Sequence, residues 1–187
     1  ERAYKTSRDI VKLEQQVDQR TSSIARDFDR VCGVLTTLGY LQQQDGVHRV
    51  SADGHVLGRI YCELDLLVSE CLRSGIWHGL SPDQLAAAVS TLVFESRRDE
   101  DVPPAFPEGE LGEVLTIMQK TWGELKDIES QHKSDYLRDL DFGFVWPTLR
   151  WARGQALTKV LKNSDLQPGD FVRWTKQVID LLTQISV

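Results

Sequence analysis

The stretch GDFVRWTKQVIDLLTQI, which runs from Gly169 to Ile185, carries two parallel columns of side chains when it is read as a helix. Apolar residues recur at intervals of four, three and four positions, as they do in a helix that is buried along one side. This apolar column consists of Trp174, Val178, Leu181 and Ile185. The stretch therefore predicts a helix that is anchored in the core of a larger helical domain.

A second column, made of long or hydrogen-bonding side chains, runs beside the apolar one at the same intervals. It consists of Arg173, Gln177, Asp180 and Gln184. Every amphipathic helix has a solvated side, so ordinary exposure is a sufficient explanation of the polar column. A functional explanation has to come from the rest of the chain.

The composition restricts the classes of protein to which the chain can belong. Its 187 residues, 41% of them hydrophobic and 27% charged, suffice for one domain or for one domain with an appendage. The sequence contains no apolar run of membrane-spanning length, and its first residues lack a signal-peptide core, so we expect a cytoplasmic protein without a membrane partner. The net charge of -6 argues against binding nucleic acid mainly by phosphate neutralisation, so that any such contact must be local.

Motifs that carry catalysis are missing from the sequence. The phosphate-binding pattern G-x-x-x-x-G-K-[ST], the dinucleotide pattern G-x-G-x-x-G and the nucleophile pattern G-x-S-x-G do not occur, and the four histidines lack a partner at a recognisable spacing. The three cysteines, Cys32, Cys62 and Cys71, are too far apart to form a C-x-x-C pair and predict reduced thiols rather than a metal site. We therefore expect no catalysis from this chain alone.

The first third of the chain predicts an appendage and a small β-hairpin. Residues 1–27 have a helical apolar spacing with an almost wholly polar exposed side, which predicts a stalk or linker helix. Within residues 28–62, the pair Asp45-Gly46 signals a turn, the sequence VHRV alternates as a strand does, and Ser51 and Asp53 offer caps for a following helix. This order predicts a winged-helix-like remnant that leads into the bundle.

Residues 63–187 predict a bundle of helices. Ser81, Pro82 and Gln84 have the spacing of a capping box with proline at the first helical position. A long helix from Leu111 to Ile128 is expected to be the central member, after a proline-rich loop over residues 97–110. Pro147 and Gly154 mark the first turn and the end of a shorter helix. The predicted fold is all-α, a helical bundle with a small winged-helix-like β-hairpin remnant near the N-terminus.

Several signatures occur together in this chain: LTTLGYL, GRIYCELDLLVSECLRSGIWHGLSPDQLAAAVSTLVFESR, WARGQALTKVL and GDFVRWTKQVIDLLTQI. In combination they resemble DSHCT, the C-terminal helical domain of superfamily-two DEAD/DEAH-box RNA helicases related to the exosome-cofactor, superkiller and HelY proteins. The sequence of the last signature most resembles the actinobacterial HelY branch. The resemblance spans roughly residues 28–185, and because the family pattern continues further, we expect the bundle to be truncated at its C-terminal end.

The resemblance implies a domain that closes a ring around single-stranded RNA, with GDFVRWTKQVIDLLTQI as the ratchet helix that touches the strand. Arg173, Gln177 and Asp180 then fall on the RNA-facing column, with Gln184 at its end. Arg173 would contact phosphate or a base, and its polar neighbours would bond base edges or sugar hydroxyls. Some branches have a second arginine at the position of Gln177. Because Gln177 is neutral, we expect the helix of this chain to guide the RNA strand and not to hold it tightly.

Two single residues of this helix have alternative interpretations. Trp174 could stack on RNA, but its spacing favours the core. Asp170 is expected to cap the helix and to complement its dipole.

The resemblance also implies cofactors and partners. ATP and magnesium would be bound by other domains of the parent helicase, which hydrolyses ATP, and this chain would hold no cofactor. The expected partners are single-stranded or structured RNA, the motor domains of the same chain, and a nuclease or ribosome. The alternative is a protein-interaction platform that docks a nuclease or ribosomal partner without touching RNA.

Overall fold

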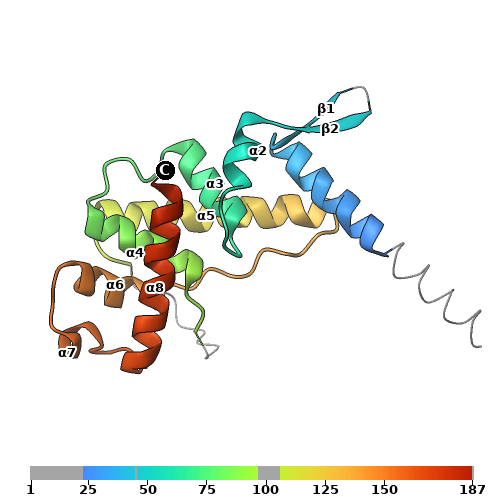
Figure 1. Cartoon of the computed structure of the whole chain (residues 1–187). Coiled ribbons are helices and arrows are strands. Elements are labelled where there is room, and N and C mark those ends of the chain that lie inside the picture. The colour runs from blue at the N-terminus through green and yellow to red at the C-terminus, as the bar shows by residue number, and fades with distance from the viewer. Residues whose placement is uncertain (1–22, 45, 97–105, 187) are drawn as a thin grey trace, which may run out of the picture.

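The computed structural model describes residues 23–44, 46–96 and 106–186. This part of the chain is mostly helical, with one two-stranded antiparallel sheet, which confirms the predicted fold class (Figure 1). The stalk predicted over residues 1–27 falls largely outside the described residues. Within them, no helix combines the length and the apolar character that crossing a membrane requires.

The predicted hairpin is present and is framed by helices. A helix over residues 23–37 is followed by β1 (Leu41–Gln44), which pairs antiparallel with β2 (Val47–Val50). Gly46 has φ +76° in the turn, a conformation that glycine adopts without strain. The helix α2 (Ala52–Leu57) follows directly, and Ser51 caps it as expected, since its Oγ accepts a hydrogen bond from the backbone N–H of Gly54 at 3.1 Å.

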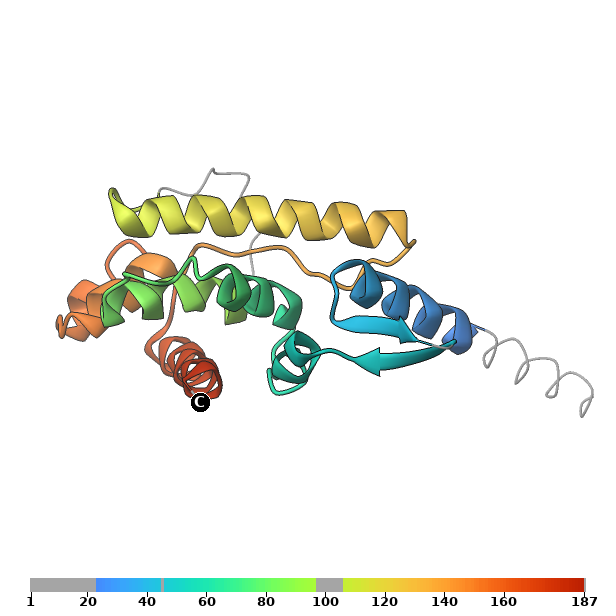
Figure 2. The same ribbon diagram turned by 90° about the horizontal axis from the view of Figure 1, so that it is seen from above.

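The bundle begins with α3 (Asp65–Ser74) and α4 (Pro82–Val93). The predicted capping box of α4 is confirmed, because the backbone N–H of Ser81 donates to Oε1 of Gln84 at 2.9 Å. The long helix α5 (Glu110–Gln131) then runs along one side of the molecule, as Figure 2 shows. The chain ends with α6 (Val145–Ala152), the short α7 (Leu157–Val160) and α8 (Pro168–Ile185).

The centre of the bundle is α4 and not α5, so the expectation that the long helix is central is wrong. Seven consecutive residues of α4, from Ala86 to Leu92, are buried, whereas α5 buries one stripe and leaves residues such as Ile117 exposed. The reason is side-chain size: alanine and serine let neighbouring helices approach α4 from several sides. Both α6 and α8 pack directly against it.

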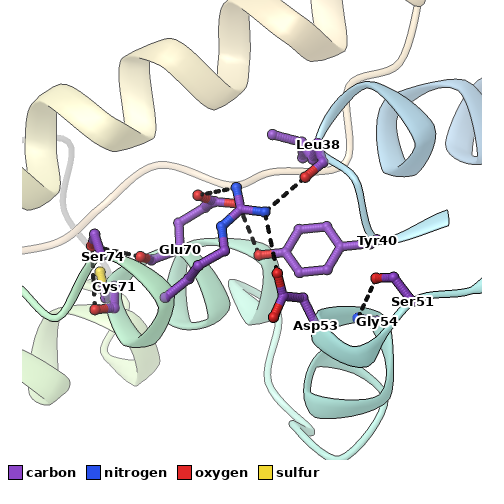
Figure 3. Close-up of polar contacts among 9 residues, drawn as sticks. Leu38, Tyr40, Ser51, Asp53, Gly54, Glu70, Cys71 and Ser74 are labelled. Carbon is purple, nitrogen blue, oxygen red and sulfur yellow. Dashed lines mark hydrogen bonds and ion pairs between the residues drawn. The ribbon is translucent and has the colours of Figure 1, made fainter. Parts of the chain in front are cut away.

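A polar network joins the hairpin region to the bundle (Figure 3). The hydroxyl of the buried Tyr40 donates to Oε1 of Glu70 on α3 at 2.8 Å. Arg73, one turn further along α3, donates to both carboxylate oxygens of Glu70 at 2.6 and 2.7 Å and to the carbonyl of Leu38 at 2.8 Å. These bonds hold the end of the first helix and the start of β1 against α3.

Candidate nucleic-acid interface

The helix α8 is anchored along one side by its apolar column. Of the predicted column, Val178 and Leu181 are buried, and Trp174 and Ile185 are partly buried against the core. The sequence reasoning missed Phe171, which is 4% exposed and lies three positions before Trp174, a spacing that would have revealed it. Its ring lies 5.6 Å from that of Phe144 at the start of α6.

The start of α8 differs from the expectation. Pro168 is the first helical residue and Gln167 occupies the cap position, so Asp170 lies inside the first turn and is not the cap. The helix begins earlier than expected because proline, which has no backbone N–H to satisfy, suits the first helical position. A carboxylate in the first turn still complements the positive end of the helix dipole.

The polar column lies on the outer side of α8, although not uniformly. Arg173, Gln177 and Asp180 are exposed, whereas Gln184 is half-buried. Within the described residues, neither Arg173 nor Gln177 has a hydrogen-bond or ion-pair partner, so both side chains are available to a ligand. The column predicted from the sequence is therefore presented to solvent in its N-terminal half.

Trp174 supports the cationic end of this column. The guanidinium carbon of Arg173 lies 4.4 Å from the centre of the Trp174 ring, a cation–π contact. The ring in turn meets the ring of Phe94 edge-on at 5.3 Å. Trp174 is thus packed against the end of α4 and at the same time holds the arginine head group at the surface, which fits the core role favoured for it.

The C-terminal half of the column is engaged within the protein. Oε1 of Gln184 accepts a hydrogen bond from the backbone N–H of Tyr61 at 2.7 Å, and its Nε2 donates to Oδ2 of Asp180 at 2.8 Å. Two of the four candidate residues therefore bond each other and fix the end of α8 to the segment that precedes α3. Their role is to orient the helix as much as to offer contacts.

The sequence reasoning also missed a third column on α8. Val172, Lys176, Ile179 and Thr183 recur at the same intervals and are all exposed. Lys176 lies three positions after Arg173, on a neighbouring part of the surface, and has no carboxylate partner within the described residues. Intervals of four, three and four positions also connect these residues, so the sequence could have predicted this column. It was missed because it contains both polar and apolar residues.

The chemistry of this surface is that of binding. An arginine, a lysine and an amide can pair with phosphate and with base edges without proton transfer. The cysteines contribute nothing to it: burial raises the pKa of Cys71 to about 12 and that of Cys62 to about 11, so both thiols stay protonated near neutral pH.

The comparisons with known proteins agree on one family. Residues 47–187 match the family model described as the DSHCT (NUC185) domain. The chain is 39% identical to the probable helicase HelY of Mycobacterium tuberculosis over 196 residues, covering 99% of the chain and 22% of that protein. It is 25% identical over 161 residues to the ATP-dependent RNA helicase mtr4 of Schizosaccharomyces pombe, covering 81% of the chain and 14% of the relative. The chain thus spans about a fifth of the length of the HelY proteins.

Proposed function

The chain belongs to the DSHCT domain family, and we propose that it is the RNA-guiding, channel-closing C-terminal domain of an ATP-dependent RNA helicase. Relatives named as helicases, among them HelY, the RNA helicase mtr4 and the antiviral helicase SKI2 of Saccharomyces cerevisiae, support the helicase context. The observation that carries the proposal is the N-terminal half of α8, where Arg173 and Gln177 lie exposed beside a buried column, with no hydrogen-bond or ion-pair partner among the described residues.

In this proposal α8 touches the strand without gripping it. Arg173, with its planar head group held over Trp174, contacts a phosphate or stacks on a base, and Gln177 offers hydrogen bonds about one turn further along. Lys176 adds a second cation beside them. Because Gln177 is neutral and the chain is acidic as a whole, these contacts are few and local, as a sliding strand requires.

The remaining parts of the helicase reaction are assigned to other domains. We propose that ATP and magnesium are bound by motor domains elsewhere in the parent protein, against which this bundle packs to close the channel. In this division, residues 1–27 form a stalk or linker, residues 28–62 the winged-helix-like unit and residues 63–187 the bundle. The RNA would be single-stranded or structured.

The experiment that tests the proposal is the substitution Arg173→Glu in the full-length protein. Reversing one charge-assisted contact costs about 1.5–3 kcal/mol, so RNA-stimulated ATPase and unwinding should fall about tenfold or more. Nucleotide affinity and the ATPase rate without RNA should not change. Arg49→Glu, which reverses an exposed charge on β2, is the control. Unchanged unwinding by folded Arg173→Glu protein would rule out a guiding role for α8.

An alternative function is docking of a protein partner such as a nuclease or ribosomal protein. One observation favours it: Val172 and Ile179, seven positions apart on α8, are 50% and 47% exposed. The double substitution Val172→Ser with Ile179→Ser separates the two functions. If α8 guides RNA, RNA-stimulated ATPase survives this change better than it survives Arg173→Glu. If α8 docks a protein and does not touch RNA, RNA-stimulated ATPase of the purified protein survives both changes.

A further inference from the structure

Positive charge is concentrated in one part of this acidic chain. Residues 145–176, which include α6, α7 and the first half of α8, contain six lysines and arginines against two aspartates, a net charge of +4. The whole chain has a net charge of -6, so the remaining residues carry -10. A basic region within an acidic domain is where an anionic partner would be attracted.

Within the described residues, most of the cations in this region have no carboxylate partner. Arg153 is paired, since its Nε lies 2.7 Å from Oδ2 of Asp83. Arg150, Lys159 and Lys162 have no carboxylate partner in the part of the chain that the structure describes. By contrast, the cations of α3 and α5 are mostly paired, as Arg73 is with Glu70.

The unpaired cations of α6 and α7 lie together. Nη1 of Arg150 donates to the backbone carbonyl of Lys162 at 2.9 Å, which brings α6 against the turn that follows α7. The backbone N–H of Lys162 donates to the carbonyl of Lys159 at 3.3 Å, so both lysines belong to the same turn, and both side chains are exposed. We call Arg150, Lys159 and Lys162, with Trp146, the α6–α7 basic surface.

An aromatic side chain completes this surface. The guanidinium carbon of Arg150 lies 5.7 Å from the centre of the Trp146 ring, and Trp146 is 39% exposed. Cations interleaved with an exposed aromatic ring are typical of surfaces that bind single-stranded nucleic acid, where phosphates pair with cations and bases stack on rings. An acidic protein partner would need the cations but not the ring.

The surface is close to the candidate interface on α8. Trp151 of α6 meets Phe171, in the first turn of α8, with ring centres 6.4 Å apart. In Figure 1, α6 and α7 lie beside the N-terminal end of α8, the end nearer to Arg173. A strand that touches Arg173 and Lys176 therefore has the α6–α7 basic surface near that end of the helix.

We propose that the α6–α7 basic surface is a second binding site for the phosphate backbone of nucleic acid, which extends the contact made by α8 beyond its N-terminal end. The identity of the ligand in this inference rests on the proposed function. The location of the site does not, because it follows from the contacts of Arg150, Lys159 and Lys162. The lysines would pair with phosphates, while Trp146 would stack on a base.

The test is the salt dependence of RNA affinity of the full-length protein. Each phosphate contact to a single strand contributes about 0.7 to the slope of log affinity against log salt. The double substitution Lys159→Gln with Lys162→Gln should therefore reduce the magnitude of this negative slope by about 1.4. The affinity is measured with a fluorescent single-stranded oligoribonucleotide. The control, Lys120→Gln with Lys133→Gln at α5 and its end, removes the same charge and should leave the slope unchanged.

The outcomes distinguish this inference from the proposed function. An unchanged slope in the folded Lys159/Lys162 variant overturns the inference, even if Arg173→Glu impairs unwinding and so supports the role of α8. A slope of smaller magnitude supports it even if Arg173→Glu has no effect, in which case the proposal for α8 fails alone. If the control variant reduces the magnitude of the slope as much as the Lys159/Lys162 variant does, the slope depends only on net charge. This result would also overturn the inference. Thermal melting of each variant establishes that it is folded.

Discussion

The backbone N–H of Tyr61 donates a hydrogen bond to Oε1 of Gln184 at 2.7 Å, although the two residues are 123 positions apart in the chain. Gln184 in turn bonds Asp180 at 2.8 Å. The start of α8 is held by aromatic packing around Phe171, and its end is held by this tether. The direction in which Arg173 and Gln177 point is therefore set from both ends of the helix.

Replacing Gln184 should loosen the end of α8 without unfolding the bundle. We expect Gln184→Ala to lower the free energy of unfolding by only about 0.5–1.5 kcal/mol, because the hydrogen bond to Tyr61 is exposed and water can replace it. The amide of Tyr61 should exchange its hydrogen at least several-fold faster. Gln177→Ala removes the same side chain from the same helix, where it has no partner among the described residues, and should leave the amide of Tyr61 unaffected. Equal exchange rates in both variants would contradict the tether.

The central position of α4 predicts that it tolerates no added volume. Ala88 is fully buried, so Ala88→Leu should lower the free energy of unfolding by about 1–3 kcal/mol through overpacking. Ala152→Leu makes the same change at the exposed end of α6 and should alter stability by less than about 0.5 kcal/mol. Urea denaturation of the two variants measures both values, and a tolerated Ala88→Leu would contradict the buried position of α4.

Two helical glycines should respond oppositely to alanine. A Cβ at Gly54 in α2 would collide with the backbone carbonyl of Tyr40, which cannot move freely because it accepts a bond from the backbone N–H of Ser51 at 3.0 Å. Gly54→Ala should therefore destabilise the protein by about 1–3 kcal/mol. A Cβ at Gly123 in α5 meets open space, so Gly123→Ala should stabilise it by about 0.5–1 kcal/mol. Thermal unfolding compares the two, and shifts of the same sign would argue against the close approach at α2.

Tyr40 should make the protein sensitive to alkali. Burial, aided by the hydrogen bond to Glu70, raises the pKa of Tyr40 well above its ordinary value of 10.0. Above pH 10 the unfolded chain releases this proton while the native protein keeps it, so stability should fall by up to about 1.4 kcal/mol per pH unit. Below pH 10 the contribution is fully present.

Tyr40→Phe should reduce that slope, at a cost of about 1 kcal/mol near pH 7 from the lost hydrogen bond. The part of the slope that remains comes from Cys62 and Cys71, because burial also raises the pKa of these two thiols. The difference between wild type and variant is read from urea denaturation at pH 7 to 11. Tyr61→Phe, at a side chain that is 80% exposed, is the matched control and should keep the slope of the wild type. A slope in Tyr40→Phe as steep as that of the wild type would contradict the contribution of Tyr40.

Much of the local structure could be read from the sequence because its causes are local. The capping box at Ser81, the cap at Ser51 and the hairpin strand over residues 47–50 each depend on residues within a few positions of one another. The apolar column of α8 is of the same kind, since side chains three and four positions apart always share one side of a helix. The family resemblance rests on short stretches of sequence such as GDFVRWTKQVIDLLTQI, and the match over residues 47–187 confirms it.

The sequence by itself therefore determined most of the helices, the caps at Ser51 and Ser81, the hairpin and which side of α8 is buried. Only the tertiary structure decided that α4 is central, that Gln184 binds Tyr61, and that Arg150 meets the turn of Lys162. Periodicity shows that one side of a helix is buried, but it does not show how many neighbours surround that helix. Contacts between residues that are far apart in sequence have no characteristic interval from which they could be predicted. They form only because the intervening chain folds in a way that brings the two residues together.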